Sequence, residues 1–247
     1  MKLDVVFTPL GLPSAEIQGR TLFVIDILRA TTTICAALTH GARAVIPVAE
    51  TDEALRLAQT LDSADVVLAG ERQTLPIPGF PLGNSPREMT PEAVRGKTII
   101  LTTTNGTRAI LATQGAAAVY PMAAANLTAA GQRAREVWER DRDLVILCAG
   151  RDGHFALDDA YAAGRLVMAA LGTARRRRGL NDAALATLDL VRRYGLRWER
   201  PLAFSQSGRA LADTDLQADI LDAAREDAYP VLAQYHERRV TLVQEAA

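Results

Sequence analysis

Two stretches of the sequence place side chains that bind anions and metal ions directly behind a run of apolar residues. The first, VIDILRATTTICAAL at 24–38, carries Asp26, Arg29, Thr31 and Thr32. The second, LTTTNGTRAI at 101–110, carries Thr103, Thr104, Asn105, Gly106 and Thr107. An acid and a cation beside hydroxyls can hold Mg²⁺ and phosphate oxygens together, and glycine at a helix start lets the backbone approach an anion. The two stretches therefore predict a site for a phosphorylated ligand.

Three more acids follow other apolar runs. Glu71 comes after VVLAG, and Asp158 and Asp159 begin a helical segment after LVILCAG. We expect Asp26 to bind Mg²⁺ together with one of these three acids. Neighbouring positions on a helix point about 100° apart, so only one of Asp158 and Asp159 should face the site.

Each of these residues also has a structural interpretation. Asp26 is a reasonable cap for the helix that follows it, and threonines are common in strands and helix caps. Paired acids at a helix start respond to the positive end of the helix dipole. The two clusters as wholes are therefore stronger signals than any one of their members.

The elements that must position these residues alternate between strand and helix. Buried strands are expected at 3–7, 22–26, 44–48, 66–69, 98–102, 118–121 and 144–148. Helices are expected at 32–39, 51–61, 106–113, 127–140 and 158–171. This order predicts an α/β fold of three layers, α/β/α, with a mainly parallel or mixed sheet. Ligands of such folds bind at the carboxyl ends of strands, so three neighbouring strand ends should form the site.

An internal repeat is visible in the same stretches. GRTLFVID at 19–26 aligns with GKTIILTT at 96–103, and GARAVIPV at 41–48 aligns with GAAAVYPM at 115–122. We interpret residues 19–48 and 96–122 as a duplicated strand-loop-helix-strand unit within a single domain of residues 1–247. The alternative is that two such units look alike because βαβ sequences are built from few patterns.

Two regions depart from the alternation. Residues 70–89 contain four prolines and three glycines and are expected to be an ordered, functional loop, in which Arg72 and Asn84 complete a metal shell and an acid-group clamp. Residues 172–247 are expected to form a helical cover over the sheet edge or a subunit contact, with helices at 181–194 and 216–237. Apolar Leu216, Ile220 and Leu221 make a homodimer possible.

Composition excludes several functions. A formal charge of −1 argues against a nucleic-acid-binding protein, and the RRRR run at 175–178 is interpreted as a solvated helix end. No apolar run approaches the ~20 residues of a membrane span, and the first residues lack a signal-peptide core, so we expect a cytoplasmic protein. Cys35 and Cys148 lack an Arg six residues later, which disfavours a cysteine phosphatase.

The sequence resembles the 2-phosphosulfolactate phosphatase family through five motifs in order: VIDILRATTTICAAL, GER, GFPLGNSPRE, LTTTNGTRAI and CAGRDGHFALDDAYAAG. The resemblance covers residues 3–164, with a looser similarity at 216–220. It implies a Mg²⁺-dependent hydrolase that converts (2R)-2-phospho-3-sulfolactate, or a related 2-phosphorylated hydroxy acid, into the free acid and phosphate, as in coenzyme M biosynthesis. The chain departs from the family at Gln73, Thr74 and Leu75, which replace a more glycine-rich stretch, and at Asp158, where Glu is frequent.

Residues and resemblance together assign the site. Catalytic roles are expected for Asp26, Arg29, Asn105 and Asp159. Substrate contacts are expected from Thr31, Thr32, Arg72, Asn84, Thr103, Thr104, Gly106 and Thr107, and metal contacts from Asp26, Glu71, Asp158 and Asp159. Further cations for the substrate's acid groups are Arg72, Arg87, Arg108 and Arg151.

Three hypotheses remain open for this site. In the first, a metal-activated water attacks the phosphate while Arg29 and the loop around Asn105 stabilise charge on its oxygens. In the second, Asp26 is the nucleophile of an aspartyl-phosphate route, although Leu28 stands where haloacid dehalogenases carry a second Asp. In the third, the chain is a non-catalytic binding protein for a small phosphorylated acid.

Overall fold

A computed structural model describes residues 2–10, 12–62, 64–140, 142–173 and 178–243, so Arg175, Arg176 and Arg177 of the RRRR run lie outside the described residues. The strands are β1 Leu3–Val6, β2 Thr21–Ile25, β3 Ala44–Pro47, β4 Val66–Arg72, β5 Leu75–Pro76, β6 Thr98–Thr102, β7 Ala118–Met122, β8 Leu144–Cys148, β9 Ala233–His236 and β10 Arg239–Leu242. The α-helices are α1 Ser14–Ile17, α2 Ala30–Thr39, α3 Thr51–Gln59, α4 Pro91–Val94, α5 Gly106–Leu111, α6 Leu127–Glu139, α7 Leu157–Leu171, α8 Asp182–Tyr194, α9 Glu199–Phe204, α10 Gln206–Ala212 and α11 Gln217–Ala223. Short 3₁₀ turns are η1 Pro86–Glu88 and η2 Ala124–Asn126.

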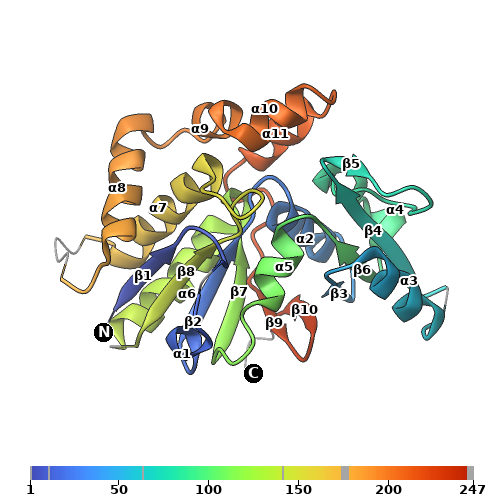
Figure 1. The fold of residues 1–247 in the computed structure, drawn as a ribbon, viewed down its shortest axis with the longest axis horizontal. Helices are drawn as coiled ribbons and strands as arrows, with labels where there is room; N and C mark the ends of the chain where they lie inside the picture. The colour runs from blue at the N-terminus through green and yellow to red at the C-terminus, as the bar shows by residue number, and fades with distance from the viewer. Residues whose placement is uncertain (1, 11, 63, 141, 174–177, 244–247) are drawn as a thin grey trace.

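The strands form one mixed sheet in the order β1-β8-β2-β7-β9-β10-β3-β6-β4-β5. Strands β1, β8, β2 and β7 run parallel to one another, and β3, β6 and β4 form a second parallel block. The antiparallel hairpin of β9 and β10 joins the two blocks (Figure 1). The predicted α/β fold with a mixed sheet is confirmed.

The two units that we interpret as a repeat are intertwined between these blocks. Strand β2 pairs with β7 of the other unit, and β3 pairs with β6. Helices α2 and α5 therefore each cross from one block to the other, and they lie side by side at the centre of the molecule (Figure 1). The prediction of three neighbouring strand ends was wrong for β6, because four strands separate it from β2. Its loop still reaches the loop after β2 because the two crossing helices begin next to each other.

Helices cover both faces of the sheet, as the alternation of apolar residues along β2 shows. Phe23 and Ile25 face a core shared with α6 and α7, whereas Leu22 and Val24 face α2 and α5. In the second block, Ile100 faces α3. The result is the three-layer arrangement. The crossing helices α2 and α5 cover the face of β2 opposite to the one covered by α6 and α7.

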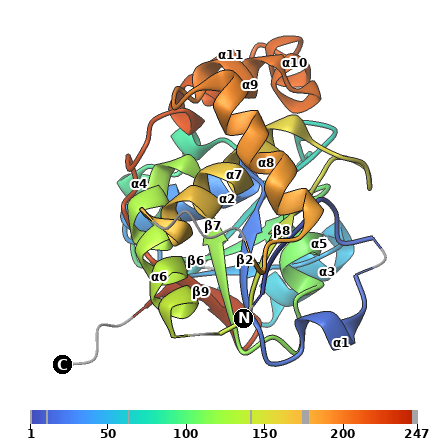
Figure 2. The same cartoon turned by 90° about the vertical axis from the view of Figure 1, so that its left-hand side faces the viewer.

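Only part of the carboxy-terminal region, residues 172–247, forms the helical cover that the sequence predicts. Helix α8 packs against α7 and β1, and α9, α10 and α11 form a cap, residues 199–223, above the loops at the carboxyl ends of β2 and β8 (Figures 1 and 2). The helix expected at 216–237 was wrong, because α11 ends at Ala223 and β9 begins at Ala233. The hairpin turn places Glu237 and Arg238 at φ 49° and 62°, a left-handed pair typical of two-residue hairpins.

The apolar residues that suggested a dimer have different surroundings. Ile220 is packed in the core and Leu216 against it, while Leu221 is exposed. The homodimer stays a prediction. Among the described residues, each helix is too short or too polar to traverse a lipid bilayer.

The hairpin should be essential for joining the two blocks. Val240 is fully buried, opposite Val45 of β3 and Tyr235 of β9. Val240→Ala removes two buried carbons and leaves a cavity, so we expect a loss of about 2 kcal/mol in the free energy of unfolding. Urea unfolding measures it, with the adjacent, half-buried Thr241→Ala as control. Equal effects of the two substitutions would contradict the role given to Val240.

Candidate active site

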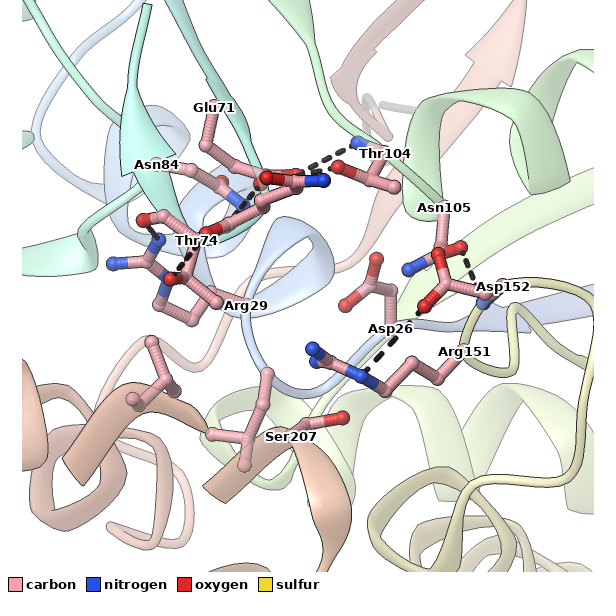
Figure 3. A pocket seen from close by; sticks show the side chains of 13 residues that line it. Asp26, Arg29, Glu71, Thr74, Asn84, Thr104, Asn105, Arg151, Asp152 and Ser207 are labelled. Carbon is pink, nitrogen blue, oxygen red and sulfur yellow. Dashed lines mark hydrogen bonds and ion pairs between the residues drawn. The ribbon is translucent and has the colours of Figure 1, made fainter. Parts of the chain in front are cut away.

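A cavity of about 370 Å³ lies where the loops of the two repeat units meet the cap (Figure 3). It is lined by Asp26, Leu28, Arg29, Glu71, Gln73, Thr74, Asn84, Thr104, Asn105, Arg151, Asp152, Ser207 and Leu211. These residues come from the loops after β2, β6 and β8, from the segment 71–84, and from α10. Seven of the predicted site residues are thus brought together: Asp26, Arg29, Glu71, Asn84, Thr104, Asn105 and Arg151.

Asp26 lies at the centre of this site, and it is buried at the start of α2. Its Oδ1 accepts a hydrogen bond from the Ala30 N–H at 3.3 Å. A Cβ on Gly106 would lie 2.4 Å from Asp26 Oδ2 and 2.5 Å from the Ala30 Cβ. Gly106 is therefore needed for α5 to pack against Asp26, and it does not line the cavity.

The paired acids of α7 have different environments. Both oxygens of Asp159 are used, since they accept the N–H groups of Ile27 and Gly150 at 3.0 Å each. Asp158 Oδ1 is buried and has no hydrogen-bond partner among the described residues. Neither acid lines the cavity. Asp159 connects the loops after β2 and β8 by its two hydrogen bonds. Asp158 keeps one oxygen without a hydrogen-bond partner in the described chain, beneath the residues that line the cavity.

Glu71 joins the segment after β4 to the second ligand loop. Its Oε1 accepts the Thr104 N–H at 2.7 Å, and its Oε2 accepts the Thr74 N–H at 2.9 Å. Side chains alternate along a strand, so the next residue points away. Arg72 donates to the Ala49 carbonyl and to Thr102 Oγ1, outside the cavity.

Gln73 and Thr74 form the turn between β4 and β5, and both line the cavity. Their φ angles are 51° and 73°, the left-handed pair that a two-residue hairpin turn requires. Glycine adopts this conformation without strain, which explains why a glycine-rich stretch suits this position.

Four predicted substrate-binding threonines hold backbone groups. Thr31 Oγ1 and Thr32 Oγ1 donate to the carbonyls of Asp26 and Ile27, each at 2.8 Å. Thr103 and Thr107 exchange hydrogen bonds between their hydroxyls and N–H groups at 3.1 Å. All four are buried outside the cavity lining, so they fix the shape of the two loops.

Arg29 is held by the cap. Its Nη1 lies 2.7 Å from Asp219 Oδ2 on α11, and its Nη2 donates to the Thr74 carbonyl at 2.7 Å. Asp219 Oδ1 accepts a hydrogen bond from Ser85 Oγ at 2.7 Å. Asp219, together with Ser207 and Leu211 of α10, was missed by sequence reasoning. The only signal was the loose family similarity at 216–220.

The amides and one arginine remain available to a ligand. Asn105 Oδ1 accepts the Asp152 N–H at 3.0 Å, which leaves its amide nitrogen facing the cavity (Figure 3). Asn84 Oδ1 and Arg151 Nε are buried, and neither has a hydrogen-bond partner within the described parts of the chain. Buried polar atoms of this kind are rare unless something else satisfies them.

The acids around the cavity repel one another. Burial raises the pKa of Asp26 to about 7, repulsion from Glu71 and Asp158 adds to the increase, and the Ala30 N–H and Arg29 oppose it. Burial raises the pKa of Asp158 to about 6, with backbone N–H groups and the Ser207 hydroxyl opposing the shift. Burial also raises the pKa of Asp159, with further repulsion from Asp158 and Asp26. A cation in the cavity would relieve this repulsion.

The donor set suits a hard divalent cation. Within the described residues, no three His, Cys, Asp or Glu side chains gather closely enough to hold a metal ion by themselves. Mg²⁺ needs no such cage, because it is commonly bound by one or two carboxylates together with substrate phosphate oxygens and water. Asp26 and Glu71, with the free oxygen of Asn84, line the cavity and fit that requirement.

Comparison with known proteins identifies the family. The model of the 2-phosphosulpholactate phosphatase family matches residues 6–238. The chain belongs to this family. It is therefore a phosphoric monoester hydrolase, and the resemblance noted in its motifs is confirmed.

Relatives in three bacteria carry the name probable 2-phosphosulfolactate phosphatase. The protein of Symbiobacterium thermophilum is 39% identical over 232 residues, which is 94% of this chain and 98% of the relative. That of Clostridium novyi is 32% identical over 98% of this chain and 100% of its own. That of Caldanaerobacter subterraneus is 45% identical over 61% of both chains.

Removing the Asp219 carboxylate should leave the Arg29 guanidinium buried without its ion-pair partner. We expect Asp219→Ala to lower the free energy of unfolding by about 3–5 kcal/mol, as for other broken buried ion pairs. The matched control is Glu226→Ala, which breaks the Arg165–Glu226 pair, whose acid is 42% exposed. Chemical denaturation measures both, and a smaller loss for Asp219→Ala than for Glu226→Ala would contradict the prediction.

The pKa of Asp26 should make the metal-free protein sensitive to pH. Its pKa of about 7 in the folded chain lies above the ordinary value of 3.8, so the folded state binds the proton more tightly. The stability that this proton gives is complete below pH 4 and is lost as the pH rises through 7. Asp26→Asn removes this dependence, so its Tm relative to the parent protein should be higher at pH 8 than at pH 5 in chelator.

Asp152→Asn is the control for this comparison, because it removes an exposed acid at the same cavity. Its Tm difference from the parent protein should be nearly the same at both pH values. A Tm difference for Asp26→Asn that does not change with pH would show that the burial of Asp26 does not have the expected effect.

Proposed function

We propose that the chain hydrolyses (2R)-2-phospho-3-sulfolactate, or a closely related 2-phosphorylated hydroxy acid, to the free acid and inorganic phosphate, a reaction of coenzyme M biosynthesis. Two observations support the substrate class: the printed names of the relatives and a cavity of about 370 Å³, which suits a small acid. The observation that carries the proposal is the group of buried, mutually repelling acids, Asp26, Glu71 and Asp158, beside Arg29 and Arg151.

This charge pattern supports a requirement for Mg²⁺. A substrate with phosphate, carboxylate and sulfonate brings several negative charges into a cavity that already contains acids, so the two repel unless a cation lies between them. Asp26 would hold the metal, together with Glu71 or Asp158 and the Asn84 oxygen. When bound, Mg²⁺ would neutralise part of the negative charge of the phosphoryl group and lower the pKa of a water molecule that it binds.

The protein groups then bind and orient the substrate. The Asn105 amide nitrogen faces the cavity and donates to a phosphoryl oxygen, while Asp152 fixes the amide through its backbone N–H. Arg29 is immobilised by Asp219 and Thr74, so its remaining N–H groups are aligned before the substrate arrives. Leu211 of the cap lines the cavity with its apolar side chain and limits access of bulk water.

We favour direct attack by water over an aspartyl-phosphate route. Asp26 Oδ1 accepts the Ala30 N–H, and the start of α5 packs at Gly106 against Oδ2, so both oxygens have neighbours where a phosphorus atom would have to approach. Labelled substrate should leave no acid-stable, base-labile phosphoenzyme after rapid quenching. Recovery of such a species, with the label on Asp26, would establish the covalent route.

The proposed function is tested by phosphate release from 2-phospho-3-sulfolactate with Mg²⁺ and with chelator. We expect release only with Mg²⁺, and a loss of about 100- to 1,000-fold in kcat for Asp26→Ala, since an electrostatic contact to the reacting group is removed. The control is Asp189→Asn, an exposed acid on α8. Circular dichroism shows whether each variant is folded. Full activity in chelator, or in folded Asp26→Ala, would contradict the proposal.

A further inference from the structure

Arg151 differs from the other arginines that the sequence offers as acceptors of substrate acid groups. Arg72 donates to backbone and Thr102, Arg87 is exposed on η1, and Arg108 pairs with Glu50 at 2.7 Å. Arg151 alone among these four lines the cavity. Its guanidinium extends into the cavity from the turn after β8, next to Asp26 and Ser207 (Figure 3).

The turn that carries Arg151 is closely defined. The Arg151 N–H donates to the His154 carbonyl at 3.0 Å, and the His154 N–H donates to the Arg151 carbonyl at 2.9 Å. Gly150 has φ 68°, and a Cβ there would lie 2.4 Å from the His154 carbonyl oxygen. Because the next N–H is bound by Asn105, the turn holds Arg151 in a fixed relation to the second ligand loop.

The Arg151 guanidinium has only a long ion pair within the described parts of the chain. Its Nε lies 3.9 Å from Asp152 Oδ2, beyond hydrogen-bond distance, and this buried Nε has no hydrogen-bond partner among the described residues. The guanidinium of Arg29, in contrast, is engaged by Asp219 at 2.7 Å and by Thr74. The end of the Arg151 guanidinium, which extends into the cavity (Figure 3), is therefore placed to donate to an acceptor on a ligand.

The two arginines serve different parts of the cavity. Arg29 comes from the loop after β2 and stabilises the charged form of Asp26, where the metal and the phosphoryl group are proposed to lie. Arg151 comes from the opposite loop and stabilises the charged form of Asp158, near the cap residue Ser207. The Arg151 guanidinium lies on the Ser207 side of Asp26, and the Asn105 amide lies on the other side (Figure 3). A substrate whose phosphate lies between Asp26 and Asn105 therefore meets Arg151 with another of its acid groups.

We propose that Arg151 binds the sulfonate of the substrate, the acid group one carbon beyond the phosphate ester, and so sets the preference for phosphorylated acids that carry a second acid group. This inference rests on the proposed function. The planar, forked guanidinium donates two parallel hydrogen bonds to the oxygens of such a group, which a lysine would not reproduce.

The test compares two substrates that differ only in the sulfonate: 2-phospho-3-sulfolactate and 2-phospholactate. For the parent protein we expect a clear preference in kcat/KM for the sulfonated substrate. Arg151→Gln should lower kcat/KM for that substrate about 10- to 100-fold, the value of a charged hydrogen bond, and by less than about 3-fold for 2-phospholactate. Arg43→Gln removes the same charge at an exposed site and should leave both values unchanged.

Asp152→Asn tests the same idea in the opposite direction. It removes the acid that attracts Arg151, and asparagine tolerates the left-handed conformation of this position, φ 51°. We expect KM for the sulfonated substrate to fall about 2- to 5-fold, in line with an exposed ion pair, and KM for 2-phospholactate to change less. This variant decides the question even if Arg151→Gln fails to fold.

The outcomes separate the inference from the proposed function. A parent protein that releases phosphate from neither substrate rejects both. If the parent protein is active and Arg151→Gln weakens the two substrates equally, Arg151 contacts the phosphoryl group or carboxylate and the sulfonate assignment is overturned. Unchanged selectivity in both Arg151→Gln and Asp152→Asn likewise overturns it.

Discussion

The burial of several acids around one cavity is the constraint on which the rest of this structure depends. Asp26, Glu71 and Asp158 come from three separate segments, and they are buried close to one another, with Arg29 and Arg151 as the nearby cations. Ordinary packing does not favour such an arrangement, because buried carboxylates lose hydration and repel one another. The fold sustains it by fixing the loops from outside, through threonine hydroxyls, Asp159 and the Arg29–Asp219 pair. The repulsion that remains is available for binding a cation.

Much of the fold could be predicted because its strands and crossing helices are locally encoded. Apolar runs such as 98–102 are buried on both faces and ended where expected. Residues 233–237 were mistaken for the end of a helix, and the hairpin 233–242 was missed, because its charged residues mask a short alternation around Ala233, Tyr235 and Val240. It forms strands because a gap between β7 and β3 supplies their partners, and this is tertiary information that a local window does not contain.

The sequence predicted where the site lies better than it predicted which residues line it. Strand ends pointed to Asp26, Glu71 and Asn105, which the structure brings to one cavity, but residue type alone did not separate a threonine that lines the cavity from one that holds the backbone. Thr104 lines the cavity while its neighbour Thr103 caps α5, and the two differ only in direction. Asp219 lies 190 positions from Arg29, and short cap helices carry no spacing that would reveal such a contact.

The two units that we interpret as a repeat contribute different side chains to the cavity. Asp26 of the first unit aligns with Thr103 of the second, and the two loops meet where Gly106 packs against Asp26. An aspartate at 103 would bring a further buried charge next to the existing acids, at a cost that rises steeply at low dielectric. A threonine there caps α5 instead and leaves Asn105 as a neutral donor. In the proposed function, the loop that carries Asp26 would hold the metal and the loop that carries Asn105 would bind the phosphoryl oxygens.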